Sequence, residues 1–163
     1  METPTKQNTL YLPIKQVYFD QIIAGTKKDE YREITPNTYK KYLACDEQGE
    51  PFYNDELVKE EDLASLEDFE QYLWFCNDGQ FPFYFRDDIK FLAMAVGYNK
   101  VRDTATVEVT DITPMIGTNP KGQELRFDFD KNDKPVLSPN GKFCMWIADF
   151  HLGKVIEKNI VSK

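Results

Sequence analysis

The chain is poor in the residues from which metal centres and disulfide frameworks are commonly built. It has a single histidine, His151, and three cysteines, Cys45, Cys76 and Cys144, which lie far apart with no C-x-x-C motif. Zinc sites and disulfide frameworks require closely spaced Cys or His residues. We therefore expect no bound metal and no cofactor, and we interpret the cysteines as packing thiols.

Long apolar runs and a recognisable export signal are also missing. No stretch approaches the roughly 20 apolar residues of a membrane helix, and residues 1–8 are polar, unlike the apolar centre of a signal peptide. We therefore expect a cytoplasmic protein without a membrane partner. The hydrophobic content of 41% predicts a folded globule, and a length of 163 residues fits one domain spanning 1–163.

Negative charge is abundant but confined to one segment. The net charge is −8, yet residues 45–78 hold twelve acidic residues against the single base Lys59, which makes this segment −11 and leaves +3 for the rest. The global charge therefore does not exclude nucleic acid, whose phosphates bind Lys and Arg. We interpret residues 45–80 as an acidic insertion. It is either a solvated surface, a lid or decoy for the cleft, or a contact surface for a protein partner.

The hydrophobic periodicity predicts an α+β fold, a small mixed β-barrel with flanking helices and the acidic insertion. A helix from Ile14 to Ile23 should end at Gly25, and further helices are expected at 37–43 and 62–75. Two closing strands should flank His151, which we interpret as a packing residue at a strand end. The expected strands, including a possible short one at 125–129, are 9–14, 28–34, 89–96, 105–110, 125–129, 143–150 and 154–157.

One motif contains charged side chains of the kinds that binding and catalytic sites use. Residues 25–32 read G-T-K-K-D-E-Y-R, a G-x-K-x-x-E-x-R spacing at the junction of the first helix and the second strand. Alternation along that strand should place Lys28, Glu30 and Arg32 on one face. Element junctions are where binding sites are often built. The bland alternative is that Glu30 only pairs with Lys27 or Arg32 and ties the helix to the strand.

These residues resemble the ASCH domains, a family within the PUA-like barrel superfamily. Besides the motif, the resemblance rests on landmarks that span nearly the whole chain: L-P-I-K at 12–15, Y-F at 18–19, G-Y at 97–98 and L-G-K-V-I-E at 152–157. The resemblance implies a PUA-like barrel with a cleft that holds RNA or a nucleotide-like small molecule. It implies nothing about residues 45–80, because this segment is longer than the family has between the second and third strands.

On this resemblance, the expected ligand-binding residues are Lys27, Lys28, Glu30, Arg32 and Tyr98. The two lysines and the arginine donate to phosphate or base acceptors, and the glutamate accepts from an exocyclic amine. A tyrosine stacks on an unpaired base. Binding of this kind should weaken as salt is raised.

A metal-independent hydrolase is the alternative, with Lys27 and Glu30 as catalytic residues. One branch of the family deacetylates a modified cytidine with a lysine, a threonine and a glutamate. Lys27 matches the lysine, but Glu30 occupies the threonine position, and only Glu124 is available for the separate glutamate. Cleavage of RNA by a lysine acid and a glutamate base is a second hydrolytic possibility. A protein-interaction module that uses the acidic insertion is the third reading.

Overall fold

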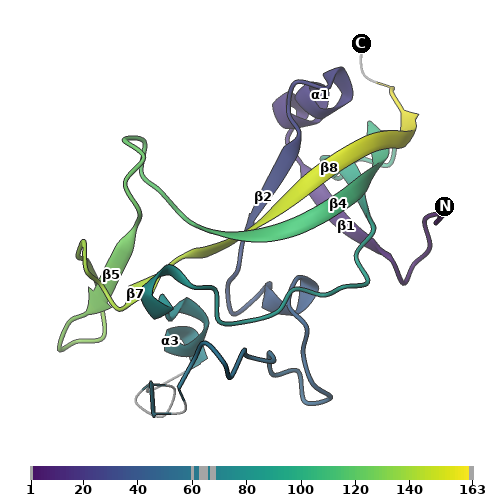
Figure 1. Cartoon of the computed structure of the whole chain (residues 1–163). Helices are drawn as coiled ribbons and strands as arrows, with labels where there is room; N and C mark the ends of the chain where they lie inside the picture. The colour runs from purple at the N-terminus through teal and green to yellow at the C-terminus, as the bar shows by residue number, and fades with distance from the viewer. Residues whose placement is uncertain (1, 60, 63–65, 67–68, 162–163) are drawn as a thin grey trace. The chain divides into compact units, whose positions relative to one another are not determined.

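The computed structural model describes residues 2–59, 61–62, 66 and 69–161. It is an α+β structure made mostly of strands, with few helices (Figure 1). The contacts group the chain into two compact units. The first contains the chain up to Glu30, Asp87–Thr113 and the chain from Asp149 onward, and the second contains Tyr31–Arg86 and Pro114–Ala148.

The larger sheet has five strands in the order β1-β3-β4-β8-β2, and the smaller sheet has three in the order β6-β5-β7. Strand β1 pairs in parallel with β3, which pairs antiparallel with β4. The bounds of the larger sheet's strands are β1 Thr9–Ile14, β2 Asp29–Glu33, β3 Phe91–Val96, β4 Thr104–Ile116 and β8 Trp146–Asn159. Those of the smaller sheet are β5 Arg126–Phe129, β6 Pro135–Leu137 and β7 Phe143–Cys144.

Helix α1 (Gln16–Ala24) ends where the sequence predicts. Gly25 adopts the left-handed conformation, with φ 79°, and its amide donates to the carbonyl of Ile22 at 3.1 Å. The helix buries Phe19 and Ile22, whereas Tyr18 of the same expected apolar face is 44% exposed. The end of α1 leads directly into the motif residues.

The core of the first unit is built around β3. Its buried residues occur on both faces of the strand, as the continuous apolar run at 89–96 predicts. Leu92 is fully buried opposite Val107 of β4, and Met94 is buried opposite Leu12 of β1. This buried strand fixes β4, which supports one residue of the site described below.

The second unit has an aromatic core. Trp146 is buried, its indole N–H donates to the carbonyl of Phe75 at 2.9 Å, and its ring lies edge-on to that of Phe81. Burial of Trp146 agrees with its interpretation as a core residue. Two cysteines of this unit, Cys76 and Cys144, are free and buried, in line with the prediction of packing thiols, whereas Cys45 is only partly buried.

Three sequence predictions about the fold are corrected. In the described part of the chain the sheets do not close into a barrel. The expected helix at 37–43 is only a single 3-10 turn, η1 (Tyr39–Lys41), because a hydrogen-bonded Thr35–Thr38 turn precedes it. Of the expected helix at 62–75, α3 covers Phe69–Trp74, with a 3-10 turn, η2 (Asn77–Gly79), after it. Leu63, assigned to that helix, lies outside the described residues.

The prediction of two closing strands is also corrected. The sequence suggests a break at residues 151–153, but β8 continues through them without interruption. Residues 125–129 form β5 as expected, and the loop after it contains the additional strand β6. None of the helices in the described ranges has the length and apolar content that crossing a bilayer requires.

Candidate functional site

Chemically reactive side chains gather in the first unit, where three neighbouring segments meet. The loop after α1 contributes Lys27, the start of β2 contributes Asp29 and Glu30, and β8 contributes Asp149 and His151. The amide of Leu152 in β8 donates to the carbonyl of Lys28 at 2.9 Å, which holds the loop against the strand. We call these five residues the acid–base cluster.

Lys27 and Glu30 form the first part of the cluster. Lys27 Nζ lies 3.7 Å from Glu30 Oε1 and donates a hydrogen bond to the carbonyl oxygen of Asp29. Glu30 is 6% exposed, which is unusual for a glutamate. The pairing agrees with the interpretation that Glu30 ties the loop to the strand, and it places an ammonium group beside a carboxylate.

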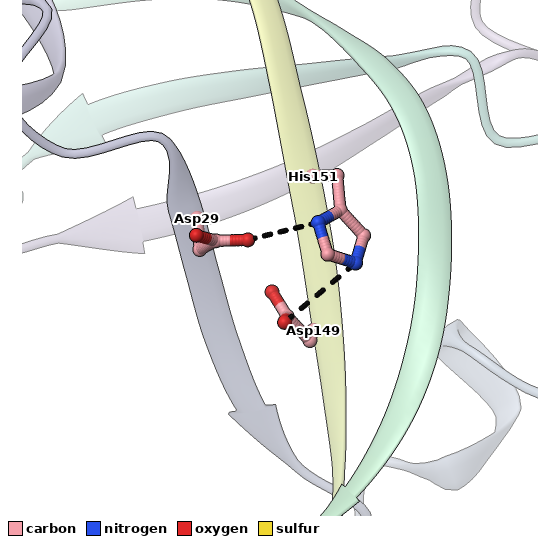
Figure 2. Close-up of side chains that lie close together, drawn as sticks. All are labelled: Asp29, Asp149 and His151. Atoms are coloured by element: carbon pink, nitrogen blue, oxygen red, sulfur yellow. Dashed lines mark ion pairs between the residues drawn. The ribbon is translucent and has the colours of Figure 1, made fainter.

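His151 forms the second part and lies between two carboxylates. Its Nδ1 is 3.0 Å from Asp29 Oδ1, and its Nε2 is 3.6 Å from Asp149 Oδ2. Figure 2 shows that the two carboxylates approach opposite nitrogens of the ring, Asp29 from β2 and Asp149 from the same strand as His151. This arrangement favours a proton on the nitrogen that faces Asp29.

Asp149 is the member of the cluster whose pKa is raised. Its side chain is 15% exposed, and its Oδ1 is buried and receives no hydrogen bond from a donor among the described residues. Burial raises the pKa of this carboxyl to about 6, and the hydrogen bond that the protonated group makes to Asp29 adds to the rise. The charges of His151 and Lys27 act in the opposite direction. A carboxyl that titrates near neutral pH is suited to general acid–base chemistry.

A divalent cation is the obvious alternative occupant. Asp29, Asp149 and His151 offer three ligand atoms within 4.8 Å of one another. However, the carboxylates contact different ring nitrogens, and a single cation binds only one of them. The geometry fits a proton-carrying imidazole between two carboxylates better than it fits a metal centre.

The structure brings together only some of the residues predicted to bind ligand. Lys28 is exposed just before β2. Arg32 is half-buried on the same face of β2 as Glu30, as the alternation predicts, but it belongs to the second unit. Tyr98 lies in the turn before β4 and is 89% exposed, whereas the cluster is near the other end of that strand. Glu124 pairs with Arg126 at 3.0 Å in the second unit.

Sequence reasoning did not single out Asp149, and it expected His151 to pack at a strand end, whereas His151 lies within β8 and pairs with two carboxylates. The available signal was their spacing, because residues i and i+2 of one strand project to the same face. That signal was hidden by the expected break at residues 151–153. No protein-family model matches the chain, and no curated protein or solved structure matches it.

Proposed function

We propose that the chain is an ASCH-like, PUA-like domain that binds an RNA base or a nucleotide-like ligand at the Lys27–Glu30 pair. The observation that carries this proposal is the pair itself, a half-buried ammonium 3.7 Å from a buried carboxylate at the junction of loop and strand. The edge of a nucleobase presents acceptors beside an exocyclic amine, so a neighbouring donor and acceptor complement it.

The charge of the cluster favours the base over the phosphate. Three carboxylates, Asp29, Glu30 and Asp149, face the charges of Lys27 and of His151 when it is protonated. A phosphate placed among three carboxylates would be repelled, whereas an exocyclic amine would find acceptors. In contrast to the salt-dependent binding expected from the sequence motif, we therefore expect a nucleoside without phosphate to bind, with an affinity that varies little with salt.

Lys27→Ala and Glu30→Gln test the proposal. Each removes one charge-assisted hydrogen bond, which is worth about 1.5–3 kcal/mol, so we expect each to weaken nucleoside binding by roughly 10- to 100-fold. The measurement is calorimetric titration of the protein with cytidine, uridine, adenosine and guanosine. Lys100→Ala and Glu157→Gln, at exposed positions of the same unit, serve as matched controls. Unchanged affinity in both cluster variants would exclude the pair as the binding site.

A metal-independent hydrolase is the second candidate, and Asp149 favours it. A pure recognition site has no need of a carboxyl whose pKa is raised to about 6 and whose buried oxygen receives no hydrogen bond from the residues that the structure describes. Such a group, next to an imidazole and an ammonium, is suited to move protons during hydrolysis. Turnover of a bound ligand, abolished by Lys27→Ala, would distinguish this candidate from binding alone.

A further inference from the structure

A threonine hydroxyl extends the cluster on the side of β4. Thr113 Oγ1 lies 2.7 Å from His151 Nε2, and the opposite ring nitrogen, Nδ1, lies 3.0 Å from Asp29 Oδ1. The hydroxyl, imidazole and carboxylate therefore form a continuous series across β4, β8 and β2. All three residues belong to the first unit and are only partly buried.

We propose that Thr113 is a nucleophile, His151 its general base and Asp29 the residue that positions the imidazole, in hydrolysis of a neutral carboxylic ester or amide. This inference rests on the hydrolytic function proposed above and adds the groups that would perform it. Covalent catalysis by a hydroxyl needs a base within about 2.6–3.2 Å and a third group that orients the base. The distances of 2.7 Å and 3.0 Å meet both requirements.

The two hydrogen bonds determine the tautomer of the imidazole. When Nδ1–H donates to Asp29, the neutral ring presents the lone pair of Nε2 to the hydroxyl of Thr113. Asp149, with Oδ2 3.6 Å from the same nitrogen, stabilises the positive charge once the ring has taken a proton. Each of the two carboxylates therefore faces one nitrogen of the ring.

The reaction proceeds in two balanced steps. In the first, Nε2 takes the proton of Thr113, Oγ1 forms a bond to the acyl carbon, and the bond to the leaving amine or alkoxide breaks as that group receives the proton. In the second, water gives a proton to Nε2 and bonds to the acyl carbon. The bond to Oγ1 then breaks, the proton returns to the threonine, and a carboxylic acid is released.

A structural role for Thr113 is the competing explanation, since threonine and histidine on neighbouring strands often hydrogen-bond. The chain offers an internal comparison. Thr110 Oγ1 donates to the backbone carbonyl of His151 at 3.2 Å, so this hydroxyl touches the same residue without touching its ring. If Thr113 is the nucleophile, replacing Thr113 should lower turnover, whereas replacing Thr110 should not.

The negative character of the cluster restricts the substrate. Asp29, Glu30 and Asp149 would repel an anionic acyl group. A neutral acyl group, such as acetyl, meets no such repulsion. We therefore choose p-nitrophenyl acetate as the probe, because its acyl group is neutral and its leaving group is observed directly by absorbance.

The experiment compares the wild type with Thr113→Val, Thr113→Ser, Thr110→Val and His151→Gln. Removing a nucleophile or its base costs roughly 100-fold or more, so Thr113→Val and His151→Gln should lose turnover by at least that factor. Thr113→Ser should retain it and Thr110→Val should leave it unchanged. Mass spectrometry after rapid quenching should find an acetyl group on Thr113 of the wild type. Circular dichroism establishes that each variant is folded.

Asp29→Asn tests the positioning residue. Because an asparagine can present its amide N–H to Nδ1, the ring is free to adopt the wrong tautomer. We expect kcat to fall with little change in KM, and activity to recover in part at higher pH. A purely structural role would lower stability without altering the pH profile.

The outcomes separate this inference from the proposed function. Full turnover by Thr113→Val, or turnover that is lost on addition of EDTA, would overturn the assignment of Thr113 as the nucleophile. Nucleoside binding that still depends on Lys27 would then preserve the recognition function. Conversely, acetylation of Thr113 in a protein that binds no nucleoside would support Thr113 as the nucleophile. It would also contradict the proposal that a nucleoside is the ligand.

Discussion

Replacing Asp149 with asparagine should stabilise the protein at pH 7.5 and lower its activity at the same time. The carboxyl is largely buried, one of its oxygens receives no hydrogen bond from a donor in the described part of the chain, and its pKa is raised to about 6 from an ordinary value of 3.8. Above pH 6 the folded protein therefore holds a charge that the unfolded chain solvates more easily. Removing the charge should raise the free energy of unfolding by on the order of 1–3 kcal/mol.

The pH dependence gives the direction of this effect. Between about pH 4 and pH 6 the folded state binds more protons at Asp149 than the unfolded state does, so its contribution to stability falls as the pH rises. The cost of the charge is small below pH 4 and complete above pH 6. The advantage of Asp149→Asn over the wild type should therefore appear at pH 7.5 and be small at pH 4.

Urea unfolding of both proteins at pH 4 and pH 7.5 measures this difference. Asp87→Asn, an exposed aspartate of the same unit, is the matched control and should change stability little at either pH. A variant less stable than the wild type at pH 7.5 would show that the carboxylate stabilises the fold. Gain of stability with loss of turnover would mark Asp149 as a residue retained for function.

Local sequence patterns predicted the elements that local interactions determine. In strand β1, buried apolar residues alternate with more exposed ones. Helix α1 ends at Gly25, and glycine adopts the left-handed conformation more easily than other residue types do. Strand β3 is apolar on both faces and is buried on both. In each case the information lies within a few residues of the element, so the bounds of β1 and the end of α1 agree closely with the prediction.

The prediction was wrong at residues 151–153, the segment ending in Gly153, where a break between two strands was expected. In the structure this glycine lies within β8, where an added Cβ would be 3.0 Å from Glu108 Oε1 and 3.0 Å from Thr110 Cγ2. A glycine inside a strand often marks a place where a neighbouring segment approaches closely. Its role depends on β4, which is distant in sequence, so no local pattern could reveal it.

The candidate site was predictable only in its local part. Lys27 and Glu30 are three residues apart and could be recognised as a possible pair from their spacing alone. The contacts of His151 with Asp29 and Thr113 depend on the order of β4, β8 and β2 in the sheet. Without knowledge of that order, a single histidine carries no sequence signal that separates a base from a packing residue.

Gly141→Ala should destabilise the second unit strongly. A Cβ at this position would lie 2.4 Å from the backbone nitrogen and 2.5 Å from the carbonyl oxygen of Phe127 in β5. Backbone atoms cannot rotate away as a flexible side chain can, so β5 itself must shift. Because Phe127 is paired with Leu137 and Phe143, the shift would disturb all three strands of the smaller sheet. We expect a loss of about 3 kcal/mol, at the upper end of the cost of overpacking.

Gly122→Ala is the matched control in the same unit. Gly122 has φ 80°, and an added Cβ would meet no atom of the described residues within 4 Å, so the substitution costs only the backbone strain of about 1 kcal/mol. The measurement is urea unfolding followed by tryptophan fluorescence, which reports on Trp74 and Trp146 of this unit. Equal losses in the two variants would mean that β5 yields to the added methyl group. A much larger loss in Gly141→Ala would show that the close approach of residue 141 to β5 is essential to the smaller sheet.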